Sequence, residues 1–106
     1  MIARIWHGIV LKENAHRYHR FLLDTGLSDY KATIGNCGVF LLKKDAEKIT
    51  HFYTLTFWTD LESIKQFAGN DVRKARYYPE DKDFLLEFEE EVNHFDVLEM
   101  PDYVKI

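Results

Sequence analysis

Residues 49–58 read ITHFYTLTFW, and this run of β-branched and aromatic residues decides the fold because it predicts a central strand. Successive side chains of a strand point to opposite faces of its sheet. One face would hold Phe52, Thr54, Thr56 and Trp58, and the other His51, Tyr53, Leu55 and Phe57. Neither face suits water, so the sheet is expected to be covered on both sides.

Two further segments show the same two-faced character. The run 2–10 (IARIWHGIV) predicts a strand with Arg4 and Trp6 opposite Ile5, His7 and Ile9. The run 37–44 (CGVFLLKK) predicts a strand with Val39 and Leu41 opposite Phe40 and Leu42, joined to 49–58 by a polar hairpin connector at 45–48. A fourth strand is expected over 91–100 (EVNHFDVLEM).

Helical spacing separates these strands. Residues 13–25 place Ala15, Tyr18, Phe21 and Leu22 on one side, Gly26 is expected to end this helix, and 27–34 has room for a further turn. A second helix is expected over 61–68, with a Thr59–Glu62 capping box at its start and Gly69 at its end. Pro79 suits the start of a short helix that reaches about Phe88.

The order of elements is therefore β-α-β-β-α-β, a single α+β domain over residues 1–106. Aromatic residues make up 15% of the chain, which indicates an aromatic core or a cavity lined with rings. The net charge of −4 gives no electrostatic reason to bind nucleic acid or anionic membranes. A lone cysteine, Cys37, and the lack of a membrane span or signal peptide favour a cytoplasmic protein.

A sheet with two apolar faces needs two covers, and the helices can supply only one of them. A second copy of the same sheet is the simplest other cover, so a homodimer is expected; the alternative is that connecting segments fold over this face. The side with Tyr53, Leu55 and Phe57 is expected to meet the partner. The side with Thr54, Thr56 and Trp58 would face the helices, and its threonines favour a ligand cavity over a simple core.

Three segments carry a resemblance to a known family, in the same order along the chain. They are residues 35–43 (GNCGVFLLK), 55–69 (LTFWTDLESIKQFAG) and 92–97 (VNHFDV). Together they resemble the second strand, the third strand with its following helix, and the closing strand of the antibiotic biosynthesis monooxygenase family. The resemblance spans nearly the whole chain.

This resemblance implies a dimeric ferredoxin-like α+β barrel with a cavity between helices and sheet. Family members with known chemistry oxidise phenolic or quinol-type substrates with O2 and use no metal or flavin, so no cofactor is expected. Related members bind and degrade haem, and many have no assigned activity. Because one fold hosts several functions, the residues of the site must decide the activity.

The resemblance also suggests cavity residues on the strand 49–58. Trp58 matches the family's tryptophan at the end of the third strand. Thr54 stands where the family often has asparagine, and Thr56 lies between them on the same face. The alternatives are a core aromatic for Trp58 and ordinary strand residues for the two threonines.

Five other residues are candidates on chemical grounds. Arg4 would favour a phenolate, and His94, in the middle of a strand, is a candidate general base; these two are the predicted catalytic residues. Trp6 would add a cavity wall, and Tyr77 and Tyr78 precede Pro79 in a loop able to close over a pocket. Structural alternatives are a salt bridge for Arg4, a core or interface histidine for His94, and hydrophobic packing for Tyr77 and Tyr78.

The remaining histidines give weaker signals. His16 and His19 lie three apart on a helix without a third ligand, so no metal site is expected. His7 and His51 are placed so that they could meet across strands, and packing at an interface is the favoured explanation for them.

Three functions remain open on the sequence. The first is a cofactor-independent monooxygenase acting on a small aromatic or quinol-like compound, which predicts a closed cavity of roughly a few hundred Å3 reaching His94 or Arg4. The second is a non-catalytic dimeric protein that binds a small molecule, for example in a stress response. Haem degradation is the third, although the stretch 70–83 lacks the histidine that the haem-degrading relatives use.

Overall fold

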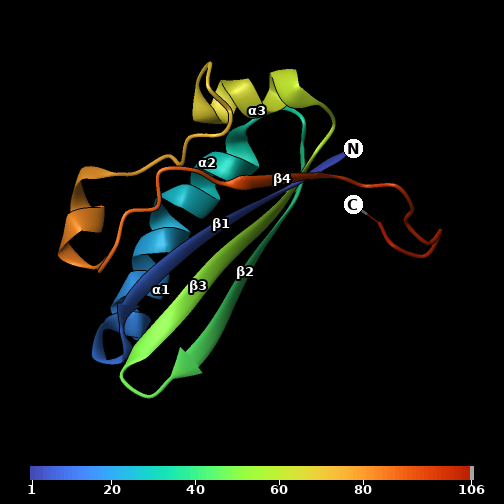
Figure 1. The fold of residues 1–106 in the computed structure, drawn as a ribbon. Coiled ribbons are helices and arrows are strands. Elements are labelled where there is room, and N and C mark those ends of the chain that lie inside the picture. The colour runs from blue at the N-terminus through green and yellow to red at the C-terminus, as the bar shows by residue number, and fades with distance from the viewer. Residues whose placement is uncertain (106) are drawn as a thin grey trace.

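The computed structural model describes residues 1–105 and shows a four-stranded antiparallel sheet with its helices on one side (Figure 1). The strands are β1 (Ile2–Leu11), β2 (Asn36–Ala46), β3 (Ile49–Trp58) and β4 (Asn93–Asp96), in the spatial order β2-β3-β1-β4. The helices are α1 (Ala15–Asp24), α2 (Gly26–Ala32) and α3 (Leu61–Ala68), with short 3-10 turns η1 (Lys12–Asn14) and η2 (Pro79–Asp83). This confirms the α+β fold and the β-α-β-β-α-β order.

The register of the central strands sets the two faces of the sheet. Trp6 of β1 lies opposite Thr54 of β3, and Arg4 lies opposite Thr56. Side chains of β3 alternate between half-buried and buried along the whole strand, as the sequence predicted. The face with Arg4, Trp6 and Thr54 turns toward the helices, which fixes where a cavity can form.

One predicted helix end is wrong. Gly26 does not end the first helix; α1 ends at Asp24, and Gly26 begins α2. Thr25 makes the break with φ −117° and ψ −89°, and its backbone N–H and its hydroxyl both donate to the carbonyl of Phe21. Gly26 is buried beside Leu22 and lines the cavity.

The start of α3 also differs from the prediction. Asp60, not Thr59, is the N-cap, because its carboxylate accepts the backbone N–H of Ser63 at 2.8 Å. The predicted end at Gly69 is confirmed, with a φ of 92° in the region that favours glycine.

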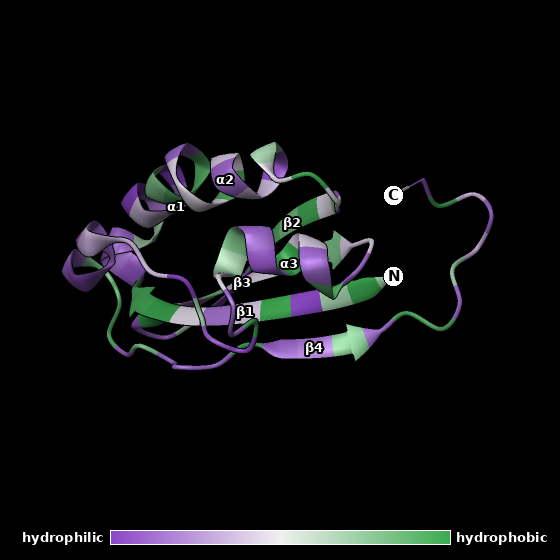
Figure 2. Cartoon of the chain, turned by 90° about the horizontal axis from the view of Figure 1, so that it is seen from above, coloured by the Kyte–Doolittle hydropathy of each residue, from purple (hydrophilic) through white to green (hydrophobic). Residues whose placement is uncertain are grey.

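Two elements are shorter than predicted. β4 covers Asn93–Asp96 instead of 91–100. It pairs with the first residues of β1, and because Ile2 lies opposite Asp96, β1 offers almost no backbone beyond that point for pairing. The helix after Pro79 is the 3-10 turn η2, which ends at Asp83. After β4 the chain leaves the sheet and extends away from the domain (Figure 2).

The outer face of the sheet has no covering element within residues 1–105 (Figure 1). Phe40 and Leu42 are each 47% exposed and Phe95 is 53% exposed, beside half-buried Tyr53 and Leu55. The alternative to a dimer, in which connecting segments fold over this face, is therefore not seen among residues 1–105. None of the helices described is long and apolar enough to cross a membrane.

Candidate functional site

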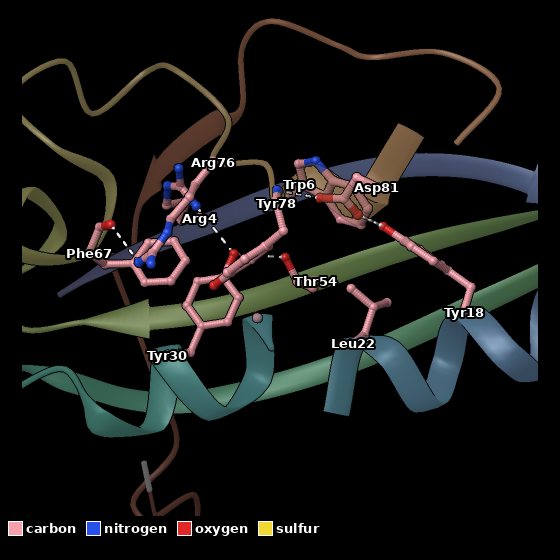
Figure 3. Close-up of a pocket in the computed structure, with 11 residues that line it drawn as sticks. Arg4, Trp6, Tyr18, Leu22, Tyr30, Thr54, Phe67, Arg76, Tyr78 and Asp81 are labelled. Atoms are coloured by element: carbon pink, nitrogen blue, oxygen red, sulfur yellow. Dashed lines mark hydrogen bonds between the residues drawn. The ribbon is translucent and has the colours of Figure 1, made fainter. Parts of the chain in front are cut away.

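A small cavity lies between the sheet, the helices and the loop that follows α3 (Figure 3). Its sheet side is formed by Arg4, Trp6 and Thr54. The helices contribute Tyr18, Leu22, Gly26, Tyr30 and Phe67, and the loop contributes Arg76, Tyr78 and Asp81.

The volume of this cavity is about 30 Å3. The expected few hundred Å3 is therefore wrong for this conformation, because aromatic rings from the three helices and from the loop fill the space. A water molecule needs roughly 10–15 Å3 by the same measure, so a water or a small ion fits and a phenol does not.

Arg4 is the charged centre of the site. Its side chain is 1% exposed. Nη1 donates to the hydroxyl of Tyr30 at 3.3 Å, and Nη2 donates to the carbonyl of Lys74 at 3.1 Å. The Tyr30 hydroxyl in turn lies 3.2 Å from Oγ1 of Thr54. Arg4, Tyr30 and Thr54 therefore form one polar chain across the cavity.

Arg4 has no acidic partner. No carboxylate of residues 1–105 forms an ion pair with it, and its buried Nε–H has no hydrogen-bond partner. The guanidinium lies 5.5 Å from the centre of the Phe67 ring, a cation–π contact. Burial lowers the pKa of Arg4, and the hydroxyl of Tyr30 works in the opposite direction. The predicted salt-bridge reading of Arg4 is thus not what residues 1–105 show.

His94 lies next to Arg4 but does not line the cavity. It is the residue of β4 opposite Arg4 in the sheet, so both side chains lie on the helix-facing side. Its Nε2 is buried and has no hydrogen-bond partner in the described part of the chain. Burial lowers the pKa of His94, and the nearby charge of Arg4 lowers it further. Both effects favour the neutral form of the imidazole.

Trp58 and Thr56 are buried behind the cavity wall, which corrects their expected place in it. Trp58 is fully buried, and its Nε1–H donates to Thr56 Oγ1 at 2.8 Å. Tyr30 and Phe67 pack against the Trp58 ring with centroids 6.1 and 5.9 Å away. These two rings line the cavity and occupy the place that Trp58 was expected to take.

Trp6 lines the cavity as predicted, and two residues hold it there. Its Nε1–H donates to the hydroxyl of Tyr77 at 3.4 Å, and that hydroxyl donates to the carbonyl of Glu89. The ring also passes over Gly8, where an added Cβ would lie 2.7 Å from Trp6 Cζ2. Tyr77 does not line the cavity; it supports Trp6 from outside.

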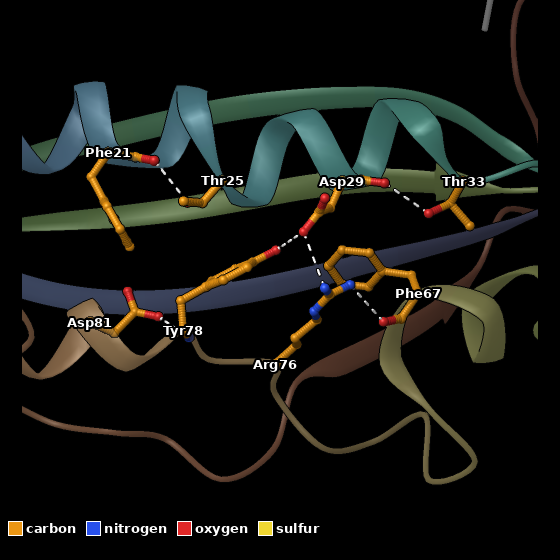
Figure 4. Close-up of polar contacts among 8 residues, drawn as sticks. All are labelled: Phe21, Thr25, Asp29, Thr33, Phe67, Arg76, Tyr78 and Asp81. Carbon is orange, nitrogen blue, oxygen red and sulfur yellow. Dashed lines mark hydrogen bonds and ion pairs between the residues drawn. The ribbon is translucent and has the colours of Figure 1, made fainter.

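The loop after α3 is fastened across the cavity by a clasp made of Tyr78, Arg76 and Asp29 (Figure 4). Tyr78 donates its hydroxyl to the Asp29 carboxylate, and Arg76 forms an ion pair with the same carboxylate at 3.1 Å. Arg76 also donates to the carbonyl of Phe67 at 3.1 Å. Burial and the bond to Asp29 raise the pKa of Tyr78, so this phenol keeps its proton.

Asp81 anchors the other end of this loop. Its buried carboxylate accepts the backbone N–H of Tyr78 at 2.7 Å and the hydroxyl of Tyr18 at 3.0 Å. Burial raises the pKa of Asp81, and the two hydrogen bonds oppose that effect. The bonded pair links the loop to α1.

The sequence analysis missed seven cavity residues. They are Tyr18, Leu22, Gly26, Tyr30, Phe67, Arg76 and Asp81. Tyr18 and Phe67 belong to the apolar sides of their helices and resemble ordinary core residues. Asp81 stands three residues after Tyr78, the spacing at which a side chain accepts a backbone N–H at a helix start, and this signal could have found it.

A separate cluster occupies the outer face of the sheet. His7 Nε2 and His51 Nδ1 are 2.9 Å apart, so these histidines meet across strands. His7 Nδ1 is 2.8 Å from the Glu89 carboxylate, and the His7 ring stacks on Tyr53 at 4.8 Å. Within residues 1–105, no group of three or more histidine, cysteine and acidic side chains is placed to hold a metal ion.

The comparisons with known proteins identify a similar fold. No family model and no curated protein matches the chain. Among solved structures, the chain is similar to a crystal structure of a mutant of MhuD with two manganese protoporphyrin IX molecules bound per active site. The TM-score is 0.61 at 14% sequence identity, over 95% of this chain and 98% of the other. This similarity confirms the ferredoxin-like α+β fold with its four-stranded antiparallel sheet.

Proposed function

We propose that this protein is a monooxygenase that oxidises a small phenolic or quinol-type compound with O2 in the cavity around Arg4, without a cofactor. The observation that supports this most is the buried guanidinium of Arg4, which has no carboxylate partner among residues 1–105 and lies within a polar chain with Tyr30 and Thr54. A cation in an apolar, aromatic cavity favours the ionised form of a phenol.

Oxidation by O2 without a cofactor requires the ionised form of the phenol. A phenol that loses its proton becomes an electron-rich phenolate, which reduces O2 directly. One oxygen atom of O2 then forms a bond to the ring, and the other leaves as water, so a phenol and O2 give a quinone and water. No outside reductant is needed, since the substrate supplies all the electrons.

Each residue of the site has a role in this proposal. Arg4 stabilises the phenolate, and Thr54 and Tyr30 orient its oxygen by hydrogen bonds. Trp6 supplies an aromatic wall. His94 is neutral and adjacent to Arg4, which suits a general base, but its ring is outside the cavity lining. Arg4 therefore has the more direct support of the two predicted catalytic residues.

A substrate the size of a phenol needs a larger cavity than the one of about 30 Å3. The loop that carries Arg76 and Tyr78 forms one wall of the cavity and is fastened to α2 through Asp29. Opening of this loop would admit the substrate, and its closure would exclude water from the oxidation.

Haem does not fit the residues of this cavity. Its volume of about 30 Å3 is far below that of a porphyrin, and its lining contains no histidine or cysteine to bind iron. The tyrosines of the lining are engaged: Tyr18 with Asp81, Tyr30 with Arg4, and Tyr78 with Asp29. A defined Soret shift at one equivalent of haem per chain would contradict this conclusion.

The test of the proposal is oxygen uptake with a panel of phenols and quinols. We expect uptake with at least one compound, and one labelled oxygen atom in the product when 18O2 is used. Binding of several compounds without uptake of oxygen by any of them would overturn the proposal and favour a non-catalytic small-molecule-binding protein.

We also propose that the outer face of the sheet joins two copies of the chain. Apolar side chains of all four strands share this face; they include Ile5, Phe40, Leu55, Phe57 and Phe95. Burying them against an identical face by two-fold symmetry removes this area from water. The partner is therefore expected to be a second copy, with each copy holding its own cavity.

A further inference from the structure

The two arginines of the cavity differ in their electrostatic partners. Arg76 is neutralised by Asp29 at 3.1 Å. Among residues 1–105, the far more buried Arg4 side chain has hydrogen bonds to the Tyr30 hydroxyl and the Lys74 carbonyl and a cation–π contact with the Phe67 ring, and it has no ion pair. Its nearest titratable neighbour across the sheet is His94, which is neutral or cationic. A buried charge without a counter-charge is costly, so the site is incomplete without an anion.

We propose that the cavity is an oxyanion site, in which the ionised oxygen of the ligand binds Arg4 and supplies its missing counter-charge. This rests on the proposed function and deepens it, since it makes the substrate an acidic compound that binds already ionised, not a neutral quinol that ionises later. The shared chemistry is an oxygen anion attached to an apolar body, either a carboxylate or an acidic phenol.

Two buried nitrogens without a hydrogen-bond partner among residues 1–105 lie at this site, one on Arg4 in the cavity lining and one on His94 beside it. The Nε–H of Arg4 is buried and bonds to nothing within residues 1–105, and the side chain lines the cavity. Nε2 of His94 is buried on the same side of the sheet, also without a partner. An anion beside Arg4 would offset the positive charge that disfavours protonation of His94 and would stabilise the imidazolium.

The dimensions and the walls of the cavity fit this ligand class. A volume of about 30 Å3 accepts an anion such as formate without rearrangement. The surrounding rings of Trp6, Tyr30, Phe67 and Tyr78 would contact the apolar body of a larger acid once the loop opens. Charge at one end and rings around it predict selectivity for aromatic acids.

The experiment compares matched ligands on the wild-type chain by calorimetry and thermal shift. Benzoate is paired with benzamide, 4-nitrophenol with 4-nitroanisole, and formate tests the smallest oxyanion. We expect benzoate to bind at least about tenfold tighter than benzamide, because a charge-assisted hydrogen bond is replaced by a neutral one. Binding of 4-nitrophenol should tighten as pH rises through its own ionisation, while 4-nitroanisole should show no such change.

Two variants test whether Arg4 causes the preference for benzoate over benzamide. Arg4→Gln should abolish the preference for benzoate, while Arg73→Gln, which removes an exposed arginine paired with Asp71, should keep it. Should Arg4→Gln fail to fold, an NMR titration of His94 in the wild-type chain decides instead. Saturating benzoate is expected to raise the imidazole pKa, and benzamide is expected to leave it unchanged.

Equal affinity for benzoate and benzamide, or an unchanged His94 pKa with benzoate bound, would overturn the inference. The result of this binding experiment can be distinguished from the result of the oxygen-uptake test of the proposed function. Selective anion binding without oxygen uptake would support the oxyanion site and reject the monooxygenase, whereas oxidation of neutral quinols without anion selectivity would do the opposite.

Discussion

The two tryptophans have different roles in this molecule, although both lie on the helix-facing side of the sheet. Trp58 is fully buried, donates to Thr56 and packs against Tyr30 and Phe67. Trp6 lines the cavity and is held by Tyr77. Substitutions at the two positions should therefore affect different measurements.

Trp58→Phe is expected to lower the free energy of unfolding by about 1–3 kcal/mol, because it leaves a cavity in the core and removes the bond to Thr56. The affinity for benzoate should remain close to that of the wild type. Trp6→Phe should weaken benzoate binding, since it changes a wall of the cavity. Urea unfolding and calorimetry measure both effects. The reverse pattern would show that Trp58, not Trp6, contacts the ligand.

His94 supports a prediction about acid sensitivity. Its pKa in the folded state lies below the ordinary value of 6.5, so between these two values the unfolded chain binds more protons than the folded chain. Stability should therefore fall as the pH drops below about 6.5. His94→Gln should lose less stability on acidification, as measured by urea midpoints across this range. His16→Gln, an exposed substitution on α1, is the matched control and should keep the wild-type loss; equal losses in all three chains would contradict the assignment.

Strand alternation was enough to predict which residues of the sheet face the helices. Arg4, Trp6 and Thr54 lie on that side because a strand has a period of two. Alternation could not show that Tyr30 and Phe67 would come between Trp58 and the cavity. That arrangement depends on how α2 and α3 pack on the sheet, which is a tertiary property.

At the scale of elements, the loop after α3 decides access to the site. It forms one wall of the cavity through Arg76, Tyr78 and Asp81. Asp81 anchors it to α1, and Asp29 fastens it to α2. Because Asp29 accepts from two loop residues, a single carboxylate controls this clasp.

Asp29→Asn is expected to loosen the loop. The variant should bind benzoate with a faster association rate and should show faster hydrogen exchange over residues 70–80. The cost in stability should be modest, about 1 kcal/mol, because the ion pair is partly exposed.

Glu62→Gln is the control for this variant, since it breaks an exposed ion pair with Lys65 on α3, outside residues 70–80. It should change neither rate. An Asp29→Asn variant with wild-type association and exchange would show that the clasp does not limit access.

The sequence predicted the existence and type of most elements but not all of their ends. β3 and α3 occur where they were expected. Thr25 interrupts the first helix by local hydrogen bonds that no hydrophobic period reveals. β4 is short because its partner strand begins at Ile2, and the extent of pairing depends on another part of the chain.

At the scale of the whole molecule, the outer face of the sheet is an apolar surface that no element of residues 1–105 covers. Helices cover only the opposite face (Figure 1), while Phe40, Leu42 and Phe95 remain about half exposed. The cluster of His7, His51 and Glu89 lies on the same side as Tyr53 and would be enclosed by a partner. A second copy accounts for both features.

Leu55→Lys should convert a dimer into a monomer, because it places a charge in the middle of the proposed interface. Light scattering after size-exclusion chromatography measures the mass. Leu61→Lys replaces a leucine that is 49% exposed on α3, away from this face, and should remain dimeric. A monomeric wild-type chain at micromolar concentration would contradict the proposed pairing.

The most direct test of the account is a crystal structure of the chain with benzoate bound. We predict that the carboxylate lies within hydrogen-bonding distance of Arg4, with the ring between Trp6 and Tyr30 and the Tyr78 loop displaced. A benzoate bound elsewhere, with Arg4 still free of any anion, would contradict the claim that this cavity is the functional site.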